Sequence, residues 1–259
     1  MRREGALYTI LFAAMVCGVC SVLVSGAAVG LKERQKRNQA LERQRKVLAV
    51  TGLVGPKERL SANEVQDRFS TNIEPKIVTL QSGEYDEAID AKAFDQRRAA
   101  KDPATSQAAP ENKAKVLRLP NHALVYLLKK GDAVDQIVIP IEGKGLWSTL
   151  YGYLALDEDT TTIEGITFYE HGETPGLGGE IDNERWKALW RGRKAYDEGW
   201  APSIRIIKGQ AGPPDEDPHR VDGLSGATLT GRGVTNLLAF WLGDDGFGRY
   251  LARFRERGS

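Results

Sequence analysis

The stretch His122-Ala-Leu-Val-Tyr-Leu-Leu128, followed by Asp135-Gln-Ile-Val-Ile139, decides the fold of this chain. Both runs are rich in the β-branched and aromatic residues that favour strands. The segment between them, Lys129-Lys-Gly-Asp-Ala133, is typical of a hairpin turn. The sequence therefore predicts an antiparallel strand pair in a folded core that begins near Val116.

The segments that follow this hairpin predict more strands and then helices. Apolar runs indicate strands at 150–156, 161–169 and 203–208 and a helix at 183–190 that docks through Trp186 and Trp190. A final helix pair is expected over 232–254, broken by the glycines at 243–246. Hairpins followed by helices predict an α+β fold, with a mainly antiparallel sheet and packed helices.

A long uncharged segment lies near the N-terminus. The 26 residues from Ala6 to Leu31 carry no charge, which is enough to cross the roughly 30 Å hydrocarbon core as a helix. Small residues at 26–28 also suit a cleaved signal peptide, but the run is much longer than the apolar region of such peptides. Cys17 and Cys20 lie inside this segment and behave there as small apolar residues. A retained transmembrane helix is the favoured interpretation.

These features divide the chain into four parts. We expect an N-terminal tail at 1–5, a transmembrane helix at 6–31, a juxtamembrane helix and connecting region at 32–115, and a folded domain at 116–259. A short helix is expected at 63–69, and the Pro-, Ala- and Ser-containing region 97–113 is expected to be a loop or an insertion.

Composition narrows the functional classes. Hydrophobic residues make up 41% of the 259 residues, and 36 basic residues nearly balance 35 acidic ones. Without a strongly basic domain, nucleic acid is an unexpected partner. The three histidines are scattered without metal-ligand spacing, so no metal site is expected.

A second stretch, Asp222-Gly-Leu-Ser-Gly-Ala-Thr-Leu-Thr230, carries the functional signal. Small residues and hydroxyls precede an amphipathic helix, which places Thr228 about one turn before its N-terminus, where free N–H groups favour an anion. Two interpretations stand: a phosphate-holding loop or an ordinary turn and helix cap. His219 and Arg220 either balance such a phosphate or are solvated.

Two further loops combine glycine with apolar residues. Gly172-Glu-Thr-Pro-Gly-Leu-Gly-Gly179 allows close approach of a flat ligand, with Leu177 as an apolar surface, although a flexible surface loop is the equal alternative. In Glu142-Gly-Lys-Gly-Leu-Trp-Ser-Thr149, Trp147 either lines a pocket or packs in the core, and the core is the commoner place for it.

Three stretches, 172–179, 222–230 and 241–250, together with the N-terminal anchor and Gly145-Leu-Trp-Ser148, resemble the C subunit of the bacterial sodium-pumping NADH:quinone oxidoreductases. The related G subunit of Rnf-type electron-transport complexes carries a similar loop and is the main alternative. An anchored scaffold protein without cofactor is a second alternative.

The resemblance implies that residues 116–259 form an FMN-binding domain. Thr228 matches the position at which a flavin transferase attaches FMN through its phosphate. Leu177 would pack near the isoalloxazine, Trp147 is a candidate for the same pocket, and the remaining candidates would line the ring or shape the linkage loop: Glu173, Thr174, Gly176, Gly178, Ser225, Gly226 and Ala227.

The resemblance also implies a membrane complex of several subunits in which the flavin relays electrons from NADH toward quinone. The family places the flavin domain on the periplasmic side of the inner membrane. The charges that flank the span predict a cytoplasmic domain instead, because two arginines precede the span and seven basic residues between 32 and 46 follow it. We follow the family, since long translocated domains often escape the charge rule.

Overall fold

The computed structural model describes residues 5–131 and 133–257 and divides the chain into two compact units, one ending at Arg43 and one beginning at Gln44. Of the expected N-terminal tail, residues 1–4 lie outside the described residues. The same holds for Asp132 in the expected hairpin turn and for 258–259.

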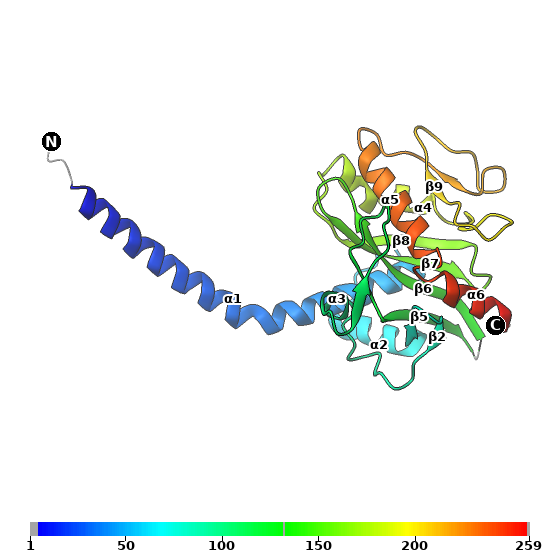
Figure 1. Cartoon of the computed structure of the whole chain (residues 1–259), viewed down its shortest axis with the longest axis horizontal. Helices are drawn as coiled ribbons and strands as arrows, with labels where there is room; N and C mark the ends of the chain where they lie inside the picture. Colours follow the sequence, from blue (N-terminus) through cyan, green and yellow to red (C-terminus); the bar gives the residue numbers. More distant parts are fainter. Residues whose placement is uncertain (1–4, 132, 258–259) are drawn as a thin grey trace. The chain divides into compact units, whose positions relative to one another are not determined.

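Helix α1 (Ala6–Val50) makes up the first unit and the first residues of the second (Figure 1). Its apolar side chains from Leu7 to Leu31 are exposed, as are Cys17 and Cys20. Within the described residues it is the one helix long and apolar enough to span a membrane. Its last turn belongs to the second unit, where Val47 and Leu48 are buried.

The second unit contains a six-stranded antiparallel sheet in the order β2-β1-β5-β6-β7-β8 (Figure 1). The expected hairpin is confirmed as the pairing of β5 with β6, with Tyr126 opposite Val138. The strands are β1 (Ile73–Thr79), β2 (Glu84–Tyr85), β5 (His122–Lys130), β6 (Ala133–Lys144), β7 (Thr149–Asp157) and β8 (Ile163–Glu170).

Short elements connect and cover this sheet. Ser61 caps α2 with a reciprocal bond to Glu64. Trp186 and Trp190 are buried as expected, although α4 ends at Ala188, before Trp190. These elements are α2 (Ala62–Asn72), α3 (Gln96–Lys101), β3 (Ser106–Ala108), β4 (Arg118–Pro120), η1 (Gly178–Asp182), α4 (Glu184–Ala188), β9 (Arg205–Ile206), β10 (Arg220–Val221), α5 (Thr228–Trp241) and α6 (Gly248–Arg257).

The expected α+β fold class is confirmed, and three local expectations are corrected. The core starts before Val116, because β1 pairs with β5 along its whole length; Pro75 and Lys76 interrupt its apolar pattern. Region 97–113 is not a plain loop, since Asp95 caps α3 and β3 pairs with β4. The strand expected at 203–208 shrinks to β9, which pairs in parallel with β10 outside the main sheet.

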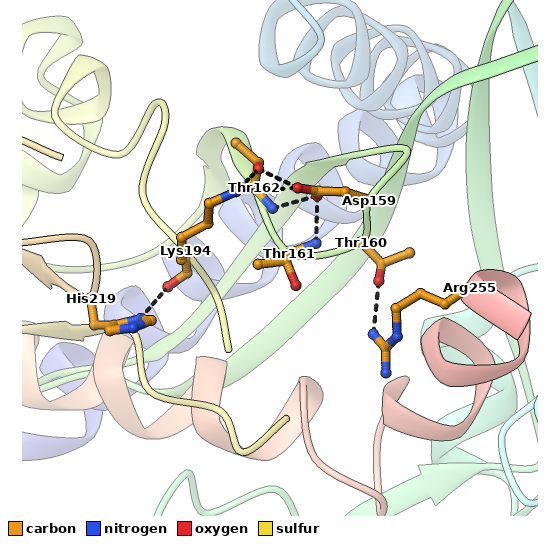
Figure 2. Close-up of polar contacts among 7 residues, drawn as sticks. All are labelled: Asp159, Thr160, Thr161, Thr162, Lys194, His219 and Arg255. Carbon is orange, nitrogen blue, oxygen red and sulfur yellow. Dashed lines mark hydrogen bonds and ion pairs between the residues drawn. The ribbon is translucent and has the colours of Figure 1, made fainter. Parts of the chain in front are cut away.

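The turn between β7 and β8 is held by a polar cluster (Figure 2). The Asp159 carboxylate accepts the N–H groups of Thr161 (2.7 Å) and Thr162 (2.6 Å) and lies 3.2 Å from Lys194 Nζ. Thr160, in the left-handed region at φ +59°, accepts a hydrogen bond from Arg255 of α6 (2.7 Å). The cluster thereby ties the C-terminal helix to the sheet.

Helix α5 packs closely against β6 because each element has a glycine at the contact. A Cβ added at Gly143 would lie 2.6 Å from Leu237 Cβ, and one added at Gly233 would lie 2.5 Å from the Lys144 carbonyl oxygen. The Trp241 indole N–H donates to the Glu142 carbonyl oxygen (2.7 Å). These contacts fix the start of α5 beside the β6–β7 turn.

We therefore expect Gly233→Ala to lower the free energy of unfolding by about 1–3 kcal/mol, because the added methyl group forces α5 away from Lys144. Denaturant unfolding followed by circular dichroism measures the change. Gly55→Ala is the control, since a Cβ there would meet nothing within 4 Å. Equal stability of the two variants would show that the close contact is not required.

Candidate functional site

Thr228 is the first residue of α5 and not, as expected, one turn before the helix. The turn closes earlier because Gly226 adopts the left-handed region (φ +69°) and the Ala227 N–H donates to the Leu224 carbonyl (3.1 Å). The N-cap residue Ala227 has no side chain to accept the free N–H groups of the first turn. The cap interpretation for Ser225–Thr228 therefore fails, and the helix N-terminus is open to an external acceptor.

A cavity of about 630 Å³ opens beside Thr228. Ser225 and Gly226 line it, whereas Ala227 is buried beneath the loop. Together with the acidic Asp222, three cationic residues also line it, in β9, in the segment after it and in α5: Arg205, Lys208 and Arg232. Within the described part of the chain, none of the three forms an ion pair with a carboxylate within 4.0 Å.

These three cations were missed in the sequence. Arg232 carried a usable signal, because it stands four residues after Thr228 and so lies on the same face of α5. Arg205 and Lys208 reach the site through the short pairing of β9 with β10, which their local sequence does not reveal.

His219 and Arg220 have other partners. Arg220 forms an ion pair with Asp217 (2.7 Å), and His219 Nδ1 lies 3.0 Å from the Lys194 carbonyl oxygen (Figure 2). Neither lines the cavity beside Thr228. The suggestion that they balance a phosphate there is not supported by their positions.

The second glycine-rich segment meets the Thr228 loop through Leu177. A Cβ added at Gly226 would lie 2.9 Å from Leu177 Cδ2, yet 45% of the Leu177 surface remains exposed. The segment is ordered by the Thr174 carbonyl, which accepts the N–H groups of Leu177 (3.1 Å) and Gly179 (2.9 Å). Gly176 is in the left-handed region (φ +76°) with open space around it.

Glu173 holds this segment to two others. Its side chain is 5% exposed, and its Oε1 accepts the N–H groups of Trp147 (2.9 Å) and Ser148 (3.3 Å). Its Oε2 accepts the Leu146 N–H (3.3 Å) and the Thr230 hydroxyl (2.6 Å). Burial raises the pKa of the Glu173 carboxyl, but these hydrogen bonds outweigh burial and hold the pKa below its usual value.

Two glycines leave room for this carboxylate. A Cβ at Gly145 would lie 2.6 Å from Glu173 Oε1, and one at Gly178 would lie 2.5 Å from Thr230 Oγ1 and 2.7 Å from Glu173 Oε2. Part of the glycine pattern that suggested a flat ligand therefore serves internal packing. Trp147, whose backbone donates to the carboxylate, has a 66% exposed side chain and is not in the core.

Comparison with known proteins places this site in a family. The FMN-binding domain family matches residues 145–243. The chain is 48% identical to the C subunit of the Na(+)-translocating NADH-quinone reductase of Pseudomonas aeruginosa over 98% of both chains, and 47% identical to that of Yersinia pestis over 96% of this chain and 92% of the other. This chain belongs to the family of these C subunits, the NqrC family.

The solved structures agree with this family assignment. The crystal structure of Shewanella oneidensis NqrC matches with a TM-score of 0.77 and 35% identity, covering 86% of this chain and 99% of that one. The corresponding reductase subunit from Parabacteroides distasonis matches with a TM-score of 0.65 and 28% identity, covering 85% and 96%. The expected membership in the NqrC family, in preference to the Rnf-type G subunit, is confirmed.

The residues at the site fit an FMN. Its phosphate requires donors and positive charge, which the open N-terminus of α5 and three cations beside Thr228 provide. Its ring requires apolar surface, and four apolar side chains on the three loops are exposed: Leu146, Trp147, Leu177 and Leu229.

The lowered pKa of Glu173 predicts how the stability of the domain depends on pH. Because the folded-state pKa lies below the usual value of 4.5, the charged carboxylate contributes stability above that pH, and the contribution is lost as the pH falls through the folded-state pKa. We expect the free energy of unfolding to fall more steeply below about pH 4.5 in the wild type than in Glu173→Gln, which should be less stable at pH 7 by roughly 1–3 kcal/mol.

Urea unfolding at a series of pH values measures both effects. Glu180→Gln is the control, because it removes a carboxylate of the same segment that is hydrogen-bonded to Asn183. Identical pH profiles for wild type and Glu173→Gln would contradict the role given to the hydrogen-bonded anion.

Proposed function

We propose that this chain is a single-span, membrane-anchored flavoprotein subunit of a Na(+)-translocating NADH-quinone reductase, in which FMN covalently attached to Thr228 relays electrons. The observation that carries the attachment site is the position of the Thr228 hydroxyl. It stands exposed on the first residue of α5, beside a cavity lined by three cations without carboxylate partners among the described residues.

The attachment is a phosphoryl transfer to the Thr228 hydroxyl. The oxygen of Thr228 forms a bond to the flavin phosphorus and loses its proton, and a phosphoanhydride bond of an activated flavin donor breaks so that its other phosphate group leaves. Arg232, Lys208 and Arg205 would offset the negative charge on the phosphoryl oxygens. A separate flavin transferase supplies the donor and the general base.

The phosphodiester tethers the cofactor, and the loops position its ring. When bound, FMN supplies the redox chemistry. Leu177 and Trp147 offer apolar surfaces against which the ring packs, and the left-handed Gly176 leaves open space where a side chain would obstruct it. Thr174 and Gly178 shape the segment from which Leu177 projects.

The other subunits of the complex complete the electron path. We assign NADH oxidation, quinone reduction and sodium transport to partner subunits. A flavin exposed at the domain surface among Leu146, Leu177 and Leu229 is accessible to such partners for electron transfer. We further propose that α1 anchors the chain in the bacterial inner membrane with the flavin domain on the periplasmic side.

Co-expression with a flavin transferase tests the attachment residue. We expect the wild-type band to fluoresce on a denaturing gel and Thr228→Val to lose at least about 95% of that signal, because valine has no hydroxyl to esterify. Ser70→Ala removes an exposed hydroxyl in α2, outside the site, and should keep the signal. Fluorescence that persists in Thr228→Val would overturn the assignment, and a dark wild-type band would favour a scaffold without cofactor.

Reporter fusions at the C-terminus test the orientation. We expect a reporter that is active only in the periplasm to be active, and one that is active only in the cytoplasm to be inactive, because the long domain is translocated despite its basic flank. Activity of the cytoplasmic reporter alone would show that the seven basic residues after the span set the topology.

A further inference from the structure

The three loops of the site share one buried partner. They come from the β6–β7 turn, from the end of β8 and from the start of α5, and the Glu173 carboxylate is hydrogen-bonded to the first and the last of them. The main chain of Glu173 is also held, since its N–H donates to His171 Nδ1 (3.2 Å). One side chain therefore couples the segments that carry Trp147, Leu177 and Thr228.

The bond to Thr230 determines how the first turn of α5 is rotated. Residues two apart on a helix point in different directions. Thr230 is fully buried and donates to Glu173, whereas Thr228, two positions earlier, is exposed. A fixed Thr230 therefore directs the Thr228 hydroxyl outward, toward the side on which the cavity lies.

The carboxylate cannot be exchanged for a different group without loss. It has no ion-pair partner among the described residues, so its charge depends on the three N–H groups and one hydroxyl. The hydrogen-bonded arrangement also requires glycine at 145 and 178, because a Cβ at either would lie within 2.7 Å of the Glu173 or Thr230 oxygens. A glutamine amide would turn an N–H₂ group toward at least one of the donors.

We propose that Glu173 is a positioning residue that preforms the flavin acceptor site: through Thr230 and the N–H groups of 146–148, it holds the Thr228 hydroxyl in the orientation needed for attachment. This inference rests on the proposed attachment of FMN to Thr228. Glu173 acts on the chain before the flavin arrives, through carboxylate oxygens that both accept hydrogen bonds from protein donors.

The test measures the initial rate of flavin attachment to the full-length chain in detergent, using a purified flavin transferase and its flavin donor. We expect Glu173→Gln and Thr230→Val to slow attachment by about ten- to a hundredfold, since small misplacement of a reacting group has effects of this size. Thr230→Ser, which keeps the hydroxyl, and Glu180→Gln, on the same segment, should attach flavin at the wild-type rate.

Two further measurements separate positioning from general damage. Hydrogen exchange of the Trp147 amide, which donates to Glu173, should accelerate in flavin-free Glu173→Gln while exchange in β7 stays unchanged. The double variant Glu173→Gln/Thr230→Val should attach flavin no more slowly than the slower single variant, because both substitutions disrupt the same Thr230–Glu173 hydrogen bond.

Wild-type rates in Glu173→Gln and Thr230→Val, with Thr228→Val unlabelled, would overturn the positioning role and leave the attachment site intact. A wild-type chain that takes up no flavin would instead contradict the proposed function itself. If Glu173→Gln does not fold, Thr230→Val and Thr230→Ser decide the matter, and equal rates for these two would overturn the inference.

Discussion

The buried carboxylate of Glu173 is the interaction on which the geometry of the site depends. An isolated anion inside a protein is strongly unfavourable unless hydrogen bonds replace its water. Here three consecutive main-chain N–H groups and the Thr230 hydroxyl do so, and hydrogen bonds to a charged group contribute about 1.5–3 kcal/mol each. Because the donors come from two other loops, stabilising the charge also brings the loops together.

The rest of the second unit supports this arrangement. A glycine in β6 and one in α5 let the two elements approach closely, so the N-terminus of the helix reaches the turn that supplies the main-chain donors. The Trp186 indole donates to the Asp222 carbonyl (3.0 Å), and Asp222 Oδ1 accepts the Ala211 N–H (2.9 Å), which fixes the loop before Thr228. The Thr228 hydroxyl thus stands at the end of a packed helix, flanked by loops that are themselves tied to the sheet.

Much of the fold could be predicted from the sequence because its signals are local. The β5–β6 hairpin, the short helix that carries Trp186 and the long apolar helix follow from periodicity and run length. β1 was not predicted because Pro75 and Lys76 interrupt its apolar pattern, and its partner β5 lies far along the chain.

The site shows the same division between local and long-range signals. Leu177 and the glycine-rich loops stand out locally, whereas the Glu173–Thr230 bond and the cations Arg205 and Lys208 come together only when strands and helix are assembled.

Mass spectrometry of the peptide that contains Asp222–Thr230, taken from the chain purified with its complex, tests the central claim most directly. We expect a peptide heavier than its sequence by one FMN less one water, with fragment ions that place the added mass on Thr228. An unmodified peptide, or added mass on Ser225 or Thr230, would contradict the attachment of FMN to Thr228.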